Sequence, residues 1–549
     1  METTNLVQAI LGADNTARQR AEAQLNGQRT TDPAGLMQLF MANMKSEQAE
    51  VAQISCVLFK KYFLENSEGV SPDDLRQMQE AVMASLDFQT QPLLLLKRKG
   101  DVLAKIYALR GENEALLKLV GEWAQTADAV AKQFALYVFE ILSECHLTAA
   151  QLASHQAGFH SIFEQALQDA DMKVKVAALK ATVSFLSSIE DEAVVNSFRP
   201  LMAPILNIMV EALKSDETQG KLALESMVEL TKAHPQAWKD TAAQLIVIVS
   251  QIITATDFEE GTRSQAAEVV LTLASQSPAS LRKVTEAKTL FFPALVQMLA
   301  ECEEDDETWM ASTEGEDGTG NDVHSAAIGA IARFSFDMKE TFMLEASTPV
   351  FGASLTHADW KVRQAGYMAF GLIAESCGDH LRANLDSAMQ TACKGLTDEN
   401  HRVRYAALSC TALVLTELSP VAQQKHHQEL VPALLKVIKE EQSLKLQTHG
   451  LSCLINFTNG LIVEDDQEIN ETKKSGEILN IYGEQLFACL LENLQKGIQA
   501  SYEPLQEEVL NLLNVSATLI EEKFAPHYNS FMPLMLEILE KVEGKTLQQ

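Results

Sequence analysis

The stretch DWKVRQAGYMAFGLIAE at residues 359–375 has a near copy, NHRVRYAALSCTALVLTE, at residues 400–417. Each copy begins with a short polar residue and continues through a Val-Arg pair to an alanine two positions after the arginine. Arg404 follows Arg363 by 41 residues. The chain therefore contains the same half-buried segment twice, and this repetition predicts how the whole chain folds.

Apolar residues in the first copy are spaced as in an amphipathic α-helix. They recur at positions i, i+4, i+7 and i+8, which form one face of a helix, and polar or small residues occupy another face. The apolar positions are Ala365, Ala369, Leu372 and Ile373, and the other face holds Gln364, Tyr367, Gly371 and Glu375. Convincing β-hairpin patterns are absent, and glycine (25) and proline (14) are scarce for 549 residues. We predict an all-α protein.

The repetition indicates stacked helix pairs, because one pair cannot bury its apolar face alone. Weaker copies of the frame occur at residues 14–25, 171–179 and 443–454. We expect prolines in the first turn of the other helix of each pair, where a proline costs no hydrogen bond: Pro204, Pro293, Pro432 and Pro533. The shift of 41 residues between the two copies matches the repeat length of the HEAT class, about 40–47 residues. We predict a single HEAT-repeat α-solenoid over residues 1–549, a right-handed superhelical array of about twelve helix pairs.

Composition restricts the possible partners. The formal net charge of −31 disfavours direct binding to nucleic acid or acidic membranes and favours basic protein partners. The eight cysteines have no zinc-site spacing, so we expect buried thiols in a reducing compartment, without metal or cofactor. No apolar run approaches the ~20 residues that cross a bilayer, and the first residues lack a secretory signal pattern. We expect a soluble intracellular protein.

Two acidic segments interrupt the helical pattern. Residues 301–322, ECEEDDETWMASTEGEDGTGND, carry so many like charges that we expect a mobile loop that does not pack. The segment is longer than an ordinary connection between helices, and its Trp309 is costly for a spacer, so we expect a functional loop. Residues 463–477 form a milder acidic stretch, for which a solvated linker is the simpler interpretation.

Enzyme motifs fail on spacing. EGKT at residues 543–546 lacks the first glycine of a phosphate-binding loop, and no strand precedes it. HHQEL at residues 426–430 does not have the His-Glu-x-x-His spacing that places two imidazoles on one helix face. No serine or cysteine lies in a recognisable nucleophile motif. We expect no catalysis.

Several stretches together resemble the importin-β family of karyopherins, of the importin-five type. They are ARQRAEAQL near the amino terminus, ECEEDDETW, DWKVRQAGYMA, HRVRYAA, LINFT and EEKFAPHYNSFMP. The resemblance covers essentially the whole chain. Such importins are roughly twice as long as this chain, so the resemblance suggests an amino-terminal fragment or a naturally short relative.

The resemblance implies a nuclear import receptor that shuttles between cytoplasm and nucleus as a monomer. Its partners would be Ran-GTP, Phe-Gly nucleoporins and basic cargo with lysine-rich nuclear localisation signals, such as ribosomal proteins or histones. The family binds Ran-GTP through its first repeats, here residues 1–150, and through an acidic loop, here residues 301–322. The loop residues that match are Glu303, Glu304, Asp305, Asp306 and Glu307.

Cargo contacts are expected on the concave, acidic surface of the later repeats, residues 323–549, at the last turn of the inner helices. Counted from the basic position of each repeat (Arg363, Arg404 and Lys445), three residues lie at about the same place: Glu375, Glu417 and Asn456. In this branch of the family, the corresponding acids and amide line pockets for a lysine-bearing signal. Without the family, solvated surface acids, and an asparagine that caps a neighbouring loop, are the simpler interpretation.

The repeated arginines have a structural interpretation. We expect Arg363 and Arg404 each to pair with an aspartate of the adjacent repeat, as rungs of a ladder along the solenoid. A second class of function also remains open, a static HEAT-repeat scaffold or a chaperone for basic proteins. Release of cargo by Ran-GTP separates the two classes, because a scaffold would not respond to it.

Overall fold

A computed structural model describes residues 4–65, 70–111, 114–302, 305–311, 322–462 and 476–546. The described residues form helices joined by short connections, and no strand occurs among them. The chain divides into two compact units, Met1–Leu245 (unit 1) and Ile246–Gln549 (unit 2), with the boundary inside helix α14 (Ala242–Thr254). The predicted all-α class is confirmed.

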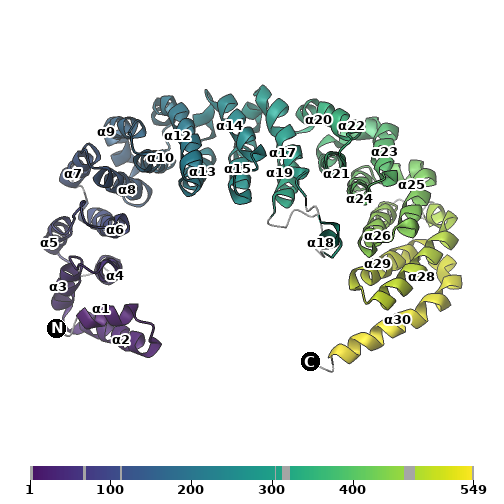
Figure 1. Cartoon of the computed structure of the whole chain (residues 1–549), viewed down its shortest axis with the longest axis horizontal. Helices are drawn as coiled ribbons and strands as arrows, with labels where there is room; N and C mark the ends of the chain where they lie inside the picture. The colour runs from purple at the N-terminus through teal and green to yellow at the C-terminus, as the bar shows by residue number, and fades with distance from the viewer. Residues whose placement is uncertain are drawn as a thin grey trace. The chain divides into compact units, whose positions relative to one another are not determined.

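Unit 1 is built from helix pairs in two layers. The second helix of each pair packs on the second helices of the pairs before and after it, and the first helix covers one side (Figure 1). The second helices are α4 (Ala49–Phe59), α6 (Leu93–Arg110), α8 (Ala129–Cys145), α10 (Met172–Ser187) and α13 (Glu217–Ala233). Their partners are α3 (Pro33–Asn43), α5 (Pro72–Met83), α7 (Glu114–Ala124), α9 (Ala149–Leu167) and α12 (Met202–Ser215), and α1 (Thr4–Leu11) with α2 (Asn15–Thr31) precedes them.

Unit 2 repeats this arrangement. Its second helices are α15 (Glu260–Gln276), α19 (Val323–Met338), α21 (Trp360–Leu372), α24 (His401–Glu417), α26 (Leu444–Asn459) and α29 (Glu503–Ile520). Each packs on the next in that order, and we call them the second-helix layer. The first helices from α19 onward are α17 (Phe292–Leu299), α20 (Glu340–Ser354), α23 (Leu385–Lys394), α25 (Val421–Glu440) and α28 (Gly483–Ala500). The last helix is α30 (Ala525–Thr546), and the HEAT-type pairing is confirmed.

The polar residue that opens the two strongest sequence repeats caps the second helix. The Asp359 carboxylate accepts a hydrogen bond from the backbone N–H of Lys361 at 3.0 Å, and the Asn400 side chain accepts one from Arg402 at 2.8 Å. Asp171 caps α10 in the same way. These caps satisfy backbone donors at the helix start that have no partner within the helix. The repeated Asp or Asn therefore marks where these second helices begin.

The prolines follow the prediction only in part. Pro293 is the second residue of α17 and Pro204 lies in the first turn of α12, as expected. Pro432 and Pro533 lie inside α25 and α30, so the prediction is wrong for these two. Both helices start about three turns or less before the proline, in polar sequence that the apolar pattern did not mark as helical.

The two kinds of helix bury different amounts of their surface. On α23, buried residues recur at i, i+3, i+4 and i+7, which is one face: Leu385, Ala388, Met389 and Ala392. On α24, buried residues lie on nearly every side, because α21, α26 and α23 all pack against it. The small residues of the second helices allow this close packing. No helix among the described residues is both long and apolar enough to span a membrane.

We predict that Gly371→Ala destabilises unit 2 by about 1–3 kcal/mol, because it overpacks the contact between α21 and α24. A Cβ atom at Gly371 would lie 2.8 Å from the Cα of Cys410, a backbone atom that cannot rotate away. Urea unfolding followed by helical circular dichroism measures the change. The control is Gly352→Ala on α20, where a Cβ meets nothing within 4 Å and alanine gains up to about 1 kcal/mol of helix propensity. Equal midpoints for the two variants would contradict the predicted close contact.

Candidate functional site

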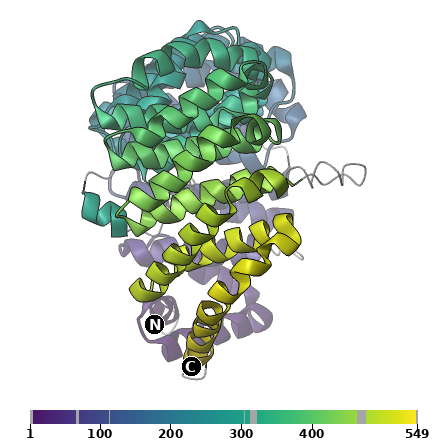
Figure 2. The ribbon, with the colours of Figure 1, turned by 90° about the vertical axis from the view of Figure 1, so that its right-hand side faces the viewer.

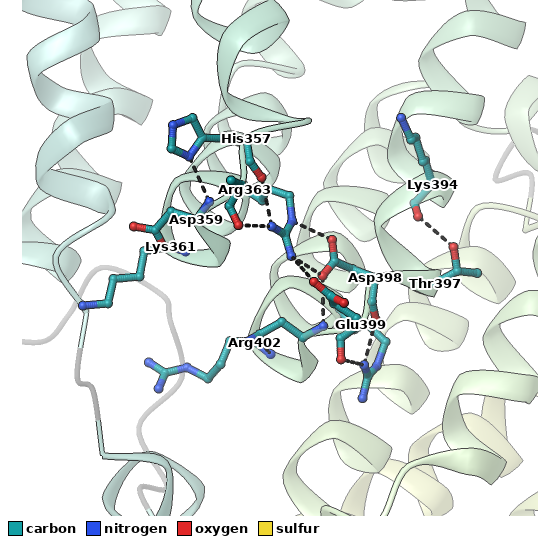
Figure 3. A network of polar contacts seen from close by, with 12 residues as sticks. His357, Asp359, Lys361, Arg363, Lys394, Thr397, Asp398, Glu399 and Arg402 are labelled. Atoms are coloured by element: carbon teal, nitrogen blue, oxygen red, sulfur yellow. Dashed lines mark hydrogen bonds and ion pairs between the residues drawn. The ribbon is translucent and has the colours of Figure 1, made fainter.

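A ladder of ion pairs joins successive repeats of unit 2. Arg363 on α21 donates to both carboxylate oxygens of Asp398, which precedes α24, at 2.8 and 2.9 Å (Figure 3). The same guanidinium donates to the backbone carbonyls of His357 and Ala358, each at 2.9 Å, at the turn before its own helix. Arg363 therefore binds one repeat to the next and closes its own turn. This pairing with an aspartate is as predicted.

The next rung has a glutamate in place of the predicted aspartate. Arg404 on α24 pairs with Glu441 at the end of α25, and it donates to the Asp398 carbonyl at 2.8 Å. Like Arg363, Arg404 therefore binds both an acid of the adjacent repeat and the turn before its own helix. An earlier rung joins Arg263, whose side chain is 3% exposed, to Glu301. Because these contacts already occupy the guanidinium groups, the arginines stabilise the fold and are poorly suited to bind cargo.

The charge of Asp398 is stabilised by this network. Burial would raise the pKa of its carboxyl group, but hydrogen bonds from Arg363 and from the backbone N–H of Asn400 outweigh burial and hold the pKa below its usual value. The native state therefore favours the ionised form. The stabilisation is present above the pKa of the unfolded chain, near 4, and is lost as the pH falls through the lower folded value.

The predicted cargo residues lie near one end of three consecutive second helices. Glu375 is exposed in η5 (Glu375–Cys377), just after α21, and Glu417 is the last residue of α24, with η5 packed against that helix. Glu417 carries an ion pair with Arg382 at 2.5 Å and its side chain is 21% exposed. Its carboxylate fits over Gly378, where a Cβ atom would approach Glu417 Oε1 to 2.2 Å. Asn456 is half-buried in the last turn of α26.

The register behind the Asn456 assignment needs a correction. Gln447 of α26 donates to the carbonyl of Glu441, six residues earlier, as Arg404 does to Asp398 and Arg363 does to His357. Gln447 therefore occupies the ladder position that the sequence comparison gave to Lys445. Counted from the helix cap, Asn456 lies about one turn earlier in its helix than Glu375 and Glu417 do in theirs.

The acidic segment is partly structured, contrary to the expectation of an unpacked loop. Helix α18 (Asp306–Ala311) forms inside it. Asp305 precedes the helix and accepts hydrogen bonds from the backbone and hydroxyl of Thr308, which lower the pKa of the Asp305 carboxyl group. Acids in the first turn suit the helix dipole. Glu303 and Glu304 lie outside the described residues, and so do residues 312–321 and 463–475 of the two acidic stretches.

Trp309 of α18 is buried, with 6% of its surface exposed, against the start of α24 and α26. Its ring packs edge-on against Tyr405 at 5.3 Å and also contacts Leu446. The Arg402 guanidinium lies over this ring at 4.4 Å, and the Lys445 ammonium lies over it at 4.5 Å. We call the residues around the indole the Trp309 cage: Arg402, Tyr405, Lys445 and Leu446.

Polar contacts complete the cage. Lys445 donates to the Trp309 backbone carbonyl at 2.9 Å. The Asp306 carboxylate lies 3.3 Å from His401 Nε2 and 3.6 Å from Arg402 Nη1. Arg402 also lies over the ring of Trp360, at 5.3 Å, so its guanidinium has an indole on α18 and another on α21. Figure 3 shows the Arg402 side chain directed away from the Asp398 network, although the two residues are close in sequence.

The sequence pattern did not reveal Arg402 and Lys445 as partners of Trp309. Both lie two positions after the helix cap, a signal visible only once the caps are known. The cysteines are free, and burial raises the pKa of Cys56 and of Cys377 to about 12. Cys145 is exposed, so the prediction of buried thiols fails there. Among the described residues, no group of three or more His, Cys, Asp or Glu side chains could hold a metal ion.

Comparison with known proteins places these features in a family. A family profile described as "IPO5-like, TPR repeats" matches residues 97–248 and 320–460, more than half of the chain. The chain belongs to the importin-β family of karyopherins. A second profile, "Importin repeat", matches residues 255–345, which include α18 of this karyopherin.

Similar proteins match between 79% and 98% of the karyopherin chain. Importin subunit beta-3 of Saccharomyces cerevisiae is 24% identical over 564 residues, which are 98% of this chain and 49% of the relative. Importin-4 of Mus musculus is 19% identical over 446 residues, 79% of this chain and 40% of the relative. The crystal structure of Kap121p matches with a TM-score of 0.86 and 21% identity, over 98% of this chain and 51% of that one. This karyopherin chain thus spans about half the length of these relatives.

We predict that Asp398→Asn destabilises unit 2 by about 1–3 kcal/mol at pH 7, since it removes one partner of a largely buried ion pair and keeps the shape. The difference from the unmodified chain should shrink as the pH falls below about 4, where the carboxylate becomes protonated. Urea unfolding at several pH values measures it. The control is Asp379→Asn, whose side chain is 90% exposed in its pair with Arg382, and which should change stability by less than about 0.5 kcal/mol. A pH-independent difference for Asp398→Asn would contradict the role of its charge.

Proposed function

We propose that this karyopherin is a nuclear import receptor, or the amino-terminal part of one, which binds basic cargo and releases it when Ran-GTP binds. The observation that carries the proposal is the match of 98% of the chain to a karyopherin fold, together with the family profile. Members of this family are transport receptors and not enzymes. Shuttling between cytoplasm and nucleus follows from the same proposal.

The known complexes of Kap121p support each proposed partner. Kap121p has been crystallised bound to RanGTP, to Nup53p and to the SUMO protease Ulp1p. By similarity, we propose Ran-GTP, a nucleoporin and a protein cargo as partners of this chain. The Phe-Gly repeats of nucleoporins and lysine-rich cargo signals are the finer forms of this proposal. The net charge of −31 supports basic segments as the chemistry recognised.

The proposed cargo groove runs along one end of the second-helix layer, past Glu375, Glu417 and Asn456. Glu375 has no ion-pair partner among the described residues and is exposed, so a cargo ammonium can reach it. Glu417 already has Arg382, so a cargo lysine must compete with this arginine for the carboxylate. This competition distinguishes the two acids and makes the groove testable.

The acidic segment is the proposed second contact for Ran. The side chain of Asp306 is 55% exposed, and Asp305 and Glu307 are exposed beside it. Such carboxylates attract a basic surface at long range. The first contact would lie in residues 1–150, which belong to unit 1. A static scaffold would have no use for a nucleotide-dependent partner, and the complex of Kap121p with RanGTP therefore favours the receptor.

We expect Glu375→Lys or Glu417→Lys to weaken binding of a fluorescent lysine-rich peptide by of order 1–3 kcal/mol, since like charge replaces a carboxylate partner. Arg382→Ala should strengthen binding, because it frees the Glu417 carboxylate. Fluorescence anisotropy measures each affinity. The control Glu80→Lys, at an exposed position of α5 in unit 1, changes the net charge equally and should have far less effect. If all three lysine variants weaken binding alike, the peptide responds to a diffuse field and there is no groove at these residues.

We also expect the triple variant Asp305→Asn, Asp306→Asn and Glu307→Gln to weaken Ran-GTP-driven release of cargo more than it weakens cargo binding without Ran. The effect should decrease with added salt, because exposed charges are screened within ~10 Å at 0.1 M. Release of labelled cargo in stopped flow provides the measurement.

A matched control for this triple variant neutralises three exposed acids elsewhere in unit 2: Glu484, Glu521 and Glu522. It should release cargo at the rate of the unmodified chain. Equal release by both triple variants would exclude a Ran contact at α18, and no response of the unmodified chain to Ran-GTP would favour the scaffold.

A further inference from the structure

The acidic segment contacts helices that lie far from it in sequence. In sequence, the segment connects α17 to α19. Its helix α18, however, packs against α24 and α26, which are the second helices two and three pairs after α19. On the way, the Cys302 thiol lies 3.6 Å from the side-chain oxygen of Gln364 on α21. In Figure 2 the short teal helix α18 lies at one edge of the stack of green helices. The segment therefore spans three repeats of the second-helix layer.

This connection differs from the main contacts between the repeats in the part of the chain that the structure describes. A second helix otherwise contacts its own first helix and its immediate neighbours, which is the usual pattern of solenoids. Neighbouring pairs alone can change their relative tilt by small amounts that add up along the array. A segment fixed at both the α17–α19 pair and the α24 and α26 helices restricts that change. The attachment of the segment to α24 and α26 depends on the burial of Trp309 in its cage.

We propose that Trp309 is a latch: while it occupies its cage it holds α21, α24 and α26 in one arrangement, and a basic partner that binds the acidic segment withdraws it. The partner's cations would compete with Arg402 and His401 for Asp306. Withdrawal removes an indole from beneath two cations and breaks the Lys445 bond to the Trp309 carbonyl. The latch is thus sensitive to a partner that recognises the acids around it.

The latch has a direct route to the proposed cargo groove. The cage lies at the first turns of α24 and α26, and Glu417 and Asn456 lie in the last turns of the same helices. A short helix moves as a rigid element, so release at one end changes the position of the other. Arg402 extends the contact to Trp360 at the start of α21, the helix that precedes Glu375. This part of the inference rests on the proposed function, whereas the latch itself does not.

The first test needs no partner. Trp309→Ala should raise amide hydrogen exchange at least tenfold in the first turns of α24 and α26 and measurably at Glu375 and Glu417. Lys445→Met, which keeps an unbranched apolar chain but removes the ammonium, should raise both this exchange and quenching of Trp309 fluorescence by acrylamide. The Trp309 signal is the difference between the unmodified chain and Trp309→Phe, since the chain has four tryptophans.

The controls separate the latch from general destabilisation. Lys436→Met on α25 removes an exposed ammonium, with its side chain 64% exposed, and should leave exchange in α24 and α26 unchanged. Trp309→Phe keeps an aromatic ring and should restore much of the protection lost in Trp309→Ala. Unchanged exchange in α24 and α26 of Trp309→Ala, or a uniform rise across unit 2, would overturn the latch.

The second test adds Ran-GTP. We expect acrylamide quenching of Trp309 to rise at least threefold when Ran-GTP is bound, and exchange in α24 and α26 to approach that of Trp309→Ala. Binding of Ran-GTP with Trp309 still shielded would overturn withdrawal of the latch by this partner. Failure of Ran-GTP to bind at all would instead refute the proposed function, and the first test would still decide whether the latch exists.

Discussion

Burial of apolar surface between neighbouring helix pairs is the constraint on which the rest of the structure depends. A second helix such as α24 has buried residues on nearly every side, so it cannot be stable with its own first helix alone. At about 25 cal/mol per Å² of apolar surface removed from water, each contact with a neighbour is a large part of the stability of a pair. Small residues at these contacts, such as Gly371 against Cys410, let the backbones approach closely. Every repeat therefore restricts the sequence of the next.

The charged residues are arranged around this apolar stack. Basic side chains of the second helices, such as Arg363 and Arg404, lie where they meet an acid at the turn before the next second helix. They satisfy backbone carbonyls of their own turns as well, which helps each short connection to hold one conformation. Much of the acidic excess remains toward solvent, and it is this excess that suits basic partners. The same ion-pair chemistry thus supports the fold in one place and the proposed recognition in another.

The acidic segment joins these two roles. Among its described residues, Asp305, Asp306 and Glu307 are exposed, whereas Trp309 is buried in the cage formed by α24 and α26. Burial beneath two cations is favourable because the indole face attracts positive charge, most strongly where water is excluded. The buried indole, the ion pairs of Asp306 and the hydrogen bond from Lys445 together hold α18 against α24 and α26. The expectation of an unpacked loop failed because it took Trp309 as a sign of function and did not expect its side chain to be buried against distant helices.

The amino-acid sequence by itself determined the all-α class, the pairing of helices into repeats, and the pairing of the repeated arginines with an acid of the adjacent repeat. These features are local or repeat at a fixed period, so a single chain displays them directly. Only the tertiary structure decided the register of Gln447 and Lys445, the pairing of Arg382 with Glu417, and the docking of Trp309. Each of these depends on side chains far apart in sequence that meet once the helices stack. Trp309 and Lys445 are separated by 136 residues, and no periodic pattern relates them.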